Sequence, residues 1–126
     1  MKQPSYIYRA RLAKRSNGKH AVYDADTVHI DVDCGFGIIH KLGACRLYGI
    51  DAPEMRGPER KDGIVSRDWM RDQLERVDEF IIESFKDAKG KYGRYLVRIF
   101  IEAPDGKAVC LNDELVERGL ARAATY

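Results

Sequence analysis

The stretch that most constrains the fold is residues 46–54, which read RLYGIDAPE. Leu47 and Ile50 are apolar and can enter a hydrophobic core, and Tyr48 between them is a residue type favoured in strands. Pro53 has no amide proton and biases the preceding residue toward extended geometry, so a strand running through this stretch must end near the proline. The stretch therefore predicts a strand that leaves the core and turns into a loop.

Charged side chains lie at both ends of this stretch. Arg46 opens it, and the carboxylates Asp51 and Glu54 flank its proline turn. Loops at strand ends often carry binding and catalytic residues. The simpler interpretation is a strand-end turn with ordinary surface charges, so the other charged segments of the chain must decide between the two.

The composition indicates a globular chain. Its 126 residues, 44% of them apolar, suffice for a single domain over residues 1–126. A net charge of +2 excludes a uniformly basic coat for nucleic acid but leaves room for a local basic patch. No run reaches transmembrane length, and the N-terminal MKQPSYIYRA lacks the apolar core of a signal peptide. We expect no membrane association and a cytoplasmic location, or secretion if a leader has been removed.

The three cysteines, Cys34, Cys45 and Cys110, are scattered and odd in number. They lack CxxC spacing, which argues against a zinc site or a disulfide framework. We expect buried or half-buried thiols.

Several segments carry strand signals, and short turns join the first of them. Asn17-Gly18 is typical of a tight hairpin turn, which predicts an antiparallel meander for the first three strands. A further turn is expected at residues 34–37 and another hairpin turn at 104–106. Strands are expected at residues 6–12, 21–23, 28–33, 38–50, 80–85, 94–101 and 108–110.

Two segments have helical spacing. Residues 63–77 place six side chains on one face, and residues 113–118 form a shorter helix. Asn112 is the expected cap of the second helix, Gly119 its end, and residues 55–62 an exposed loop. The shared face of the first helix consists of Val65, Trp69, Met70, Gln73, Leu74 and Val77.

The order of these elements predicts an α+β fold. Five principal strands with a helix after the third suggest a five-stranded Greek-key OB-type β-barrel with two or three helices. Barrels of this type commonly bind oligonucleotides or oligosaccharides.

Three segments far apart in the sequence share one chemical character. Carboxylates without His or Cys partners favour a hard cation, calcium or magnesium, over zinc. Arginines suit a phosphodiester because the guanidinium matches phosphate oxygens, and a spare carboxylate can activate water. Structural ion-pair networks use the same residue types. The three groups are Asp24 and Asp26; Arg46, Asp51 and Glu54; and Lys91, Tyr92 and Arg94.

Four motifs in order, DADTV, RLYGIDAPE, GKYGR and LNDELVERGLA, resemble those of the staphylococcal nuclease (thermonuclease) family. The resemblance covers nearly the whole chain. It implies a five-stranded OB barrel and a calcium-dependent endonuclease that hydrolyses DNA and RNA with little sequence specificity. Single strands are the favoured substrates, the products carry 3′-phosphate ends, and we expect a monomer.

The resemblance also implies a role for each matching residue. Asp26, Asp51 and the main-chain carbonyl of Ala52 correspond to the Ca²⁺ ligands. Glu54 corresponds to the carboxylate that deprotonates or orients the attacking water. Arg46 and Arg94 correspond to the arginines that bind phosphate and stabilise charge at phosphorus, and Lys91 and Tyr92 to residues beside another phosphate. Apart from these matches, we expect Asp24 and Thr27 to support the metal ligands without holding the metal, although Thr27 could also be a plain strand former.

The chain departs from the family pattern at a few positions. Ala25 stands where glycine is common, which would cost about 1 kcal/mol if the turn required a positive φ. Ala52 replaces a frequent threonine, but a carbonyl ligand needs no particular side chain. The family's tyrosine after the last motif has no clean match, with Thr125 nearest and Tyr126 one residue further on.

Two other functions fit the same residues. One is a non-catalytic OB-fold module that binds nucleic acid or a peptide, and the other is a structural scaffold whose charges form ion pairs. Because all five charged positions of the motifs are present, we expect an active nuclease. These positions are Asp26, Arg46, Asp51, Glu54 and Arg94.

Overall fold

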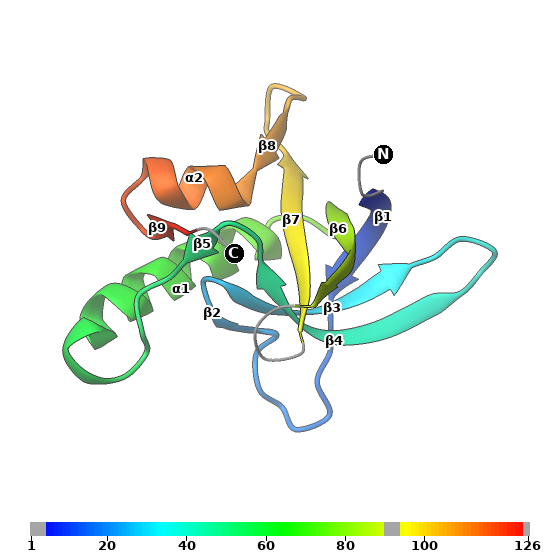
Figure 1. Ribbon diagram of the computed structural model, residues 1–126. Helices are drawn as coiled ribbons and strands as arrows, with labels where there is room; N and C mark the ends of the chain where they lie inside the picture. Colours follow the sequence, from blue (N-terminus) through cyan, green and yellow to red (C-terminus); the bar gives the residue numbers. More distant parts are fainter. Residues whose placement is uncertain (1–4, 90–93, 125–126) are drawn as a thin grey trace.

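Five strands close into a barrel in the computed structural model, which describes residues 5–89 and 94–124 (Figure 1). Their alternating residues fill a common interior, in which Ile30, Leu47, Ile82 and Ile99 are almost completely buried. The barrel strands are β1 (Ser5–Leu12), β3 (Thr27–Asp33), β4 (Ile39–Leu47), β6 (Phe80–Lys89) and β7 (Tyr95–Glu102).

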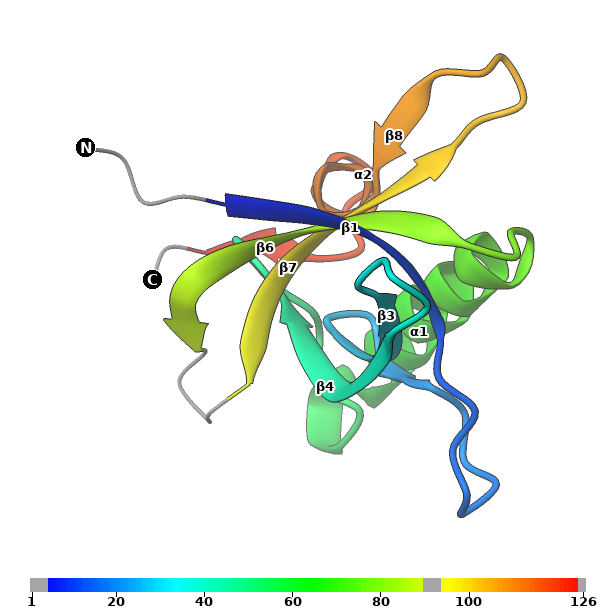
Figure 2. The ribbon, with the colours of Figure 1, turned by 90° about the vertical axis from the view of Figure 1, so that its right-hand side faces the viewer.

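The first strand closes the barrel. β1 pairs antiparallel with β6 along one edge, from Ser5 opposite Phe85, and with β3 along the other, from Arg9 opposite Asp33. The order around the barrel is β1-β6-β7-β4-β3 and back to β1, with β4 and β7 parallel. Figure 2 shows these strands curling around one axis. The expected OB-type barrel is therefore confirmed.

The expected meander of the first three strands is wrong in one pairing. The segment after β1 does turn, with Gly18 at a φ of +74°, but the strand that follows is only β2 (Val22–Asp24). β2 pairs with β3, and in the described part of the chain β1 takes β3 and β6 as its partners instead. A three-residue strand is too short to close the barrel, and β1 offers a full-length edge.

The strand expected over residues 38–50 ends earlier, at Leu47. Tyr48 and Gly49 form a turn, and Gly49 has a φ of +81°, a conformation that glycine adopts without strain. The chain then resumes as β5 (Ile50–Asp51), which pairs with β9 (Arg122–Ala123). Ile50 still reaches the core, as expected.

The first helix begins before its expected start. A 3₁₀ turn, η1 (Gly57–Glu59), leads into α1 (Arg60–Glu75), so most of the loop expected over residues 55–62 is helical. Gly63, Ser66, Met70 and Leu74 form its buried face. Val65, expected on that face, is 58% exposed because the face is rotated toward the small residues. Trp69 is partly buried and packs on the core.

The second helix also differs from expectation at its start. α2 (Leu111–Glu117) follows directly on β8 (Ala108–Cys110), so Asn112 lies inside the helix and is not its cap. The Asn112 side chain is buried and bonds to backbone groups of β7 and of the turn at Tyr48. Gly119, with a φ of +71°, ends the helix as expected, and Leu115 is buried beneath it.

The remaining sequence expectations have mixed outcomes. The thiols of Cys45 and Cys110 are buried and half-buried, but Cys34 is exposed at the tip of the β3–β4 hairpin, and all three are free. Burial raises the pKa of the Cys45 thiol to about 12. Neither helix in the described ranges has the length and apolar character needed to cross a membrane.

Candidate active site

Asp26 is the centre of the candidate site. It lies in the tight turn that joins β2 to β3, where Asp24 pairs with Thr27, and the residue is only 5% exposed. The Ala52 amide donates to Asp26 Oδ2 at 2.8 Å, and the Leu47 amide donates to the Asp26 carbonyl at 2.9 Å. These two bonds attach the turn to the far end of β4 and to the loop beyond it.

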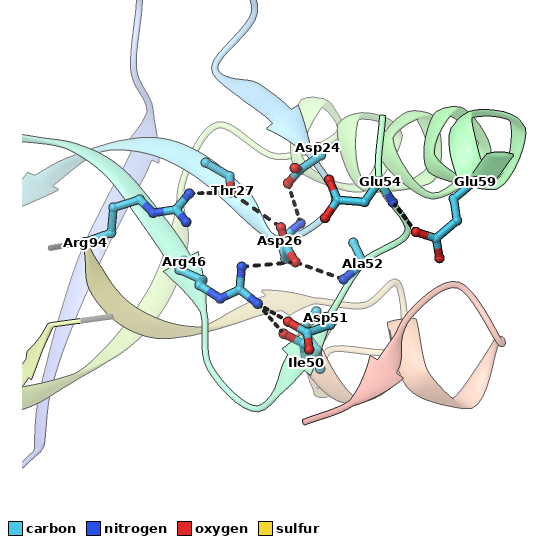
Figure 3. A network of polar contacts seen from close by, with 10 residues as sticks. All are labelled: Asp24, Asp26, Thr27, Arg46, Ile50, Asp51, Ala52, Glu54, Glu59 and Arg94. Carbon is cyan, nitrogen blue, oxygen red and sulfur yellow. Dashed lines mark hydrogen bonds and ion pairs between the residues drawn. The ribbon is translucent and has the colours of Figure 1, made fainter. Parts of the chain in front are cut away.

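Arg46 connects two of the expected metal ligands. Its Nη1 lies 3.5 Å from Asp26 Oδ2, and its Nη2 donates to Asp51 Oδ1 and, at 3.3 Å, to the Ile50 carbonyl (Figure 3). The Arg46 side chain is 15% exposed and that of Asp26 is 7% exposed. One guanidinium thus lies between carboxylates from separate segments.

Arg94 approaches the same turn from the other side. It immediately precedes β7, and its Nη1 donates to Thr27 Oγ1 at 3.0 Å. The buried Thr27 hydroxyl in turn lies 3.4 Å from Asp26 Oδ1, to which it donates. The two expected phosphate-binding arginines therefore converge on Asp26, Arg46 directly and Arg94 through Thr27.

Asp24 supports the turn and carries an altered acidity. The Asp26 amide donates to Asp24 Oδ1 at 3.1 Å, the pattern by which a short acidic side chain stabilises a turn. Burial, together with the side-chain hydrogen bond and the negative charge of Asp26, raises the pKa of Asp24 to about 7. Asp24 lies beside Asp26 in the same turn, and its supporting role stays a prediction.

Glu54 lies in the exposed loop after Pro53. Its amide donates to Glu59 Oε2 at 3.5 Å, and its side chain points toward the turn that carries Asp24 and Asp26 in Figure 3. Gly63 of α1 packs behind this loop, because a Cβ there would lie 2.5 Å from the Glu54 carbonyl oxygen. The helix thus fixes the backbone from which Glu54 projects.

The donor chemistry of the site suits a hard cation. Asp26 and Asp51 offer carboxylate oxygens, and Ala52 offers a peptide carbonyl, the ligand types that calcium prefers. Among the residues that the structure describes, three or more His, Cys, Asp or Glu side chains do not gather into a metal-binding group. Arg46 contacts both carboxylates instead. These oxygen ligands could therefore bind calcium only if the Arg46 guanidinium moved away from them.

The departures from the motif have different outcomes. Among the described residues, Phe36 is the only non-glycine residue with a positive φ, so alanine at position 25 is not strained. Ala25 is fully buried in the turn. Lys91, Tyr92, Thr125 and Tyr126 lie outside the described residues, and the roles expected of the first two stay predictions.

Sequence reasoning missed several residues that shape the site. Asn112 donates to the Tyr48 carbonyl at 2.9 Å and to the Val97 carbonyl at 3.1 Å, and accepts from the Ile99 amide at 3.0 Å. It therefore attaches α2 to the turn that follows Arg46. Gly63 did carry a signal, since glycine inside a helix is unfavourable and needs a packing reason.

A protein-family model matches the part of the chain that carries most of these side chains. A model described as staphylococcal nuclease homologue matches residues 44–126, well over half of the chain. The match includes Arg46, Asp51, Glu54 and Arg94, and it begins after the turn that carries Asp26. No curated protein matches the chain.

Proposed function

Because the chain belongs to the staphylococcal nuclease homologue family, we propose that it is a metal-dependent endonuclease that hydrolyses phosphodiester bonds. Membership supports a nuclease-type or nucleic-acid-binding domain. The finer proposal is calcium-dependent cleavage of DNA and RNA, with single strands favoured, little sequence preference and 3′-phosphate products. We also propose that the chain acts as a monomer.

The observation that carries this proposal is the convergence of charges on one buried carboxylate. Arg46 contacts Asp26 directly, and Arg94 is held toward it by Thr27. Two guanidinium groups beside a carboxylate turn are suited to the oxygens of one phosphate group. They accelerate cleavage if they bind the charge-rich transition state better than the bound substrate.

The proposed metal ligands are Asp26, Asp51 and the carbonyl of Ala52. Calcium, when bound there, would offset the negative charge of the phosphate and help to position water. Asp24 and Thr27 hold Asp26 in place through the Asp26 amide and carboxylate. We propose that Glu54, on its exposed loop, accepts the proton of the attacking water.

The proposed substrate contacts explain the expected lack of sequence preference. Arginines that bind phosphate oxygens read a group that every nucleotide carries, so they give affinity without base recognition. Lys91 and Tyr92 are the further residues proposed beside a neighbouring phosphate. Binding should weaken as salt rises, because each neutralised phosphate releases counterions.

One observation favours a second candidate function. Asp26 and Asp51 both form ion pairs with Arg46, an arrangement that needs no metal ion. A barrel with this network could bind nucleic acid or a peptide without cutting it. The two candidates differ in whether calcium changes the covalent state of the substrate.

The deciding experiment is cleavage of end-labelled single-stranded DNA and RNA by the full chain. We expect shorter products with 3′-phosphate ends in calcium and intact substrate in excess EGTA. Asp51→Asn should lose this activity, whereas Asp113→Asn, a change at an exposed position of α2, should retain it. Salt-sensitive binding without cleavage would support the non-catalytic module instead.

A further inference from the structure

The position of Arg46 makes it a competitor of the proposed metal. Its guanidinium contacts Asp26 Oδ2 through Nη1 and Asp51 Oδ1 through Nη2 (Figure 3). These are the two carboxylates that the proposed calcium site requires. By contacting both carboxylates, the Arg46 guanidinium supplies positive charge where a bound calcium ion would supply it.

The surroundings make this competition strong. The side chains of Arg46 and Asp26 are 15% and 7% exposed, so water and salt screen their charges less than at an open surface. Asp26 Oδ2 also accepts the Ala52 amide, so little bonding capacity remains on that oxygen. A second cation beside the same carboxylates would be repelled by Arg46 unless the guanidinium moved.

We propose that Arg46 is an internal counter-ion that calcium must displace. In the metal-free protein, Arg46 pairs with both Asp26 and Asp51 and offsets part of their combined negative charge. When metal enters, the guanidinium gives up these carboxylates and becomes available to phosphate. The inference deepens the proposed nuclease function and depends on it, because it makes phosphate capture conditional on metal loading.

Arg94 provides a matched comparison for this role. It carries the same charge and approaches the same turn, and its Nη1 donates to the Thr27 hydroxyl, which in turn donates to Asp26. Replacing either arginine by glutamine lowers the net charge equally. The Arg46 replacement removes the cation that contacts both proposed ligands directly.

The test is calorimetric titration of calcium into the full chain without any nucleic acid. Arg46→Gln should bind calcium at least ~10-fold more tightly than the parent, the scale expected when a unit charge is removed beside a partly buried dication. Arg94→Gln should change the affinity by less than about threefold, because its charge lies behind a hydroxyl. Unchanged or weaker calcium binding by Arg46→Gln would overturn the inference.

A second measurement uses the parent protein and avoids any folding defect of the variant. The guanidinium N–H signals of ¹⁵N-labelled Arg46 should be protected from solvent exchange in EGTA and lose that protection in saturating calcium. Arg46 signals that stay protected in calcium would contradict displacement.

These readouts separate the inference from the proposed function. Calcium-dependent cleavage combined with unchanged calcium affinity in Arg46→Gln would leave the nuclease in place and remove the counter-ion role. Tighter calcium binding by Arg46→Gln without cleavage by the parent would do the reverse. If no variant binds calcium, both the metal site and the counter-ion role fail.

Discussion

The two ends of β4 differ in which side chains they bury. At its start, the hairpin with β3 projects from the barrel, and Phe36, Ile38 and Ile39 are 100%, 56% and 58% exposed. At its end, Arg46 is mostly buried between carboxylates, and Leu47 is completely buried. Apolar side chains can stay on a protein surface without a specific partner, whereas a buried charge needs one. Polar contacts are therefore concentrated at the second end of β4, and we place the proposed catalytic site there.

The largest effect should come from removing the proposed base at the charged end. Glu54→Gln keeps the shape of the side chain but not its proton affinity, so the turnover rate should fall by ~100- to 10,000-fold. Because Glu54 is exposed, the free energy of unfolding should stay close to that of the parent. Single-turnover cleavage and urea unfolding measure the two quantities. Glu102→Gln, also exposed, is the control, and parental turnover in Glu54→Gln would remove the assigned role.

The next largest effect should be on the stability of the same end of β4. Asn112→Ala leaves the Ile99 amide and the Val97 and Tyr48 carbonyls without their side-chain partner, which should lower the free energy of unfolding by about 2 to 4 kcal/mol. Asp113→Ala removes only an exposed contact with Arg98 and should cost less than about 1 kcal/mol. Equal urea midpoints for the two variants would show that Asn112 does not brace the turn.

A smaller effect should follow from displacing the backbone of the Glu54 loop. Gly63→Ala places a methyl group against the Glu54 carbonyl, which must shift and carry the side chain with it. We expect a roughly 10- to 100-fold fall in kcat, because catalytic groups tolerate little displacement. Lys61→Ala, on the exposed side of α1, should keep parental kcat. A gain in stability from Gly63→Ala at parental kcat would mean that helix propensity outweighs the contact.

The smallest effect should appear at the apolar end of β4. Phe36→Asn removes a fully exposed ring at a φ of +57°, which asparagine tolerates better, so the free energy of unfolding should change by less than about 0.5 kcal/mol. The rate of cleavage should not change. A large loss of either quantity would show that the hairpin tip contributes to the site and would weaken the contrast between the two ends.

Local patterns predicted the parts of the fold that local forces decide. The hairpin turn at residues 104–106 and strand 108–110 lie where expected, and Gly119 ends α2 through its positive φ. The partner of β1 and the inward turn of Asn112 were not predictable in this way. Both depend on segments far away in the chain, since Asn112 reaches the Tyr48 carbonyl across 64 residues.

The candidate site was also predictable only in part from the sequence. Motifs brought together six residues that the structure also places in one network. What the motifs could not give is that Arg46 pairs with both proposed ligands, or that Gly63 packs behind Glu54. Both contacts join segments that are separate in the sequence, and although a glycine in a helix indicates close packing, it does not identify the partner. The six residues are Asp24, Asp26, Thr27, Arg46, Asp51 and Arg94.

The double pairing of β1 also has a consequence for how the chain reaches its native state. During synthesis β1 is followed soon by its partner β3, but its second partner, β6, is made later, since Tyr6 pairs with Ser84, 78 residues further along the chain (84 − 6). Until then β1 and β3 form a ribbon with an open edge, which is the kind of surface that can pair with another chain. Pairings so distant in sequence favour slow folding. Synthesis of this protein should therefore be most vulnerable to aggregation between the completion of β3 and the arrival of β6.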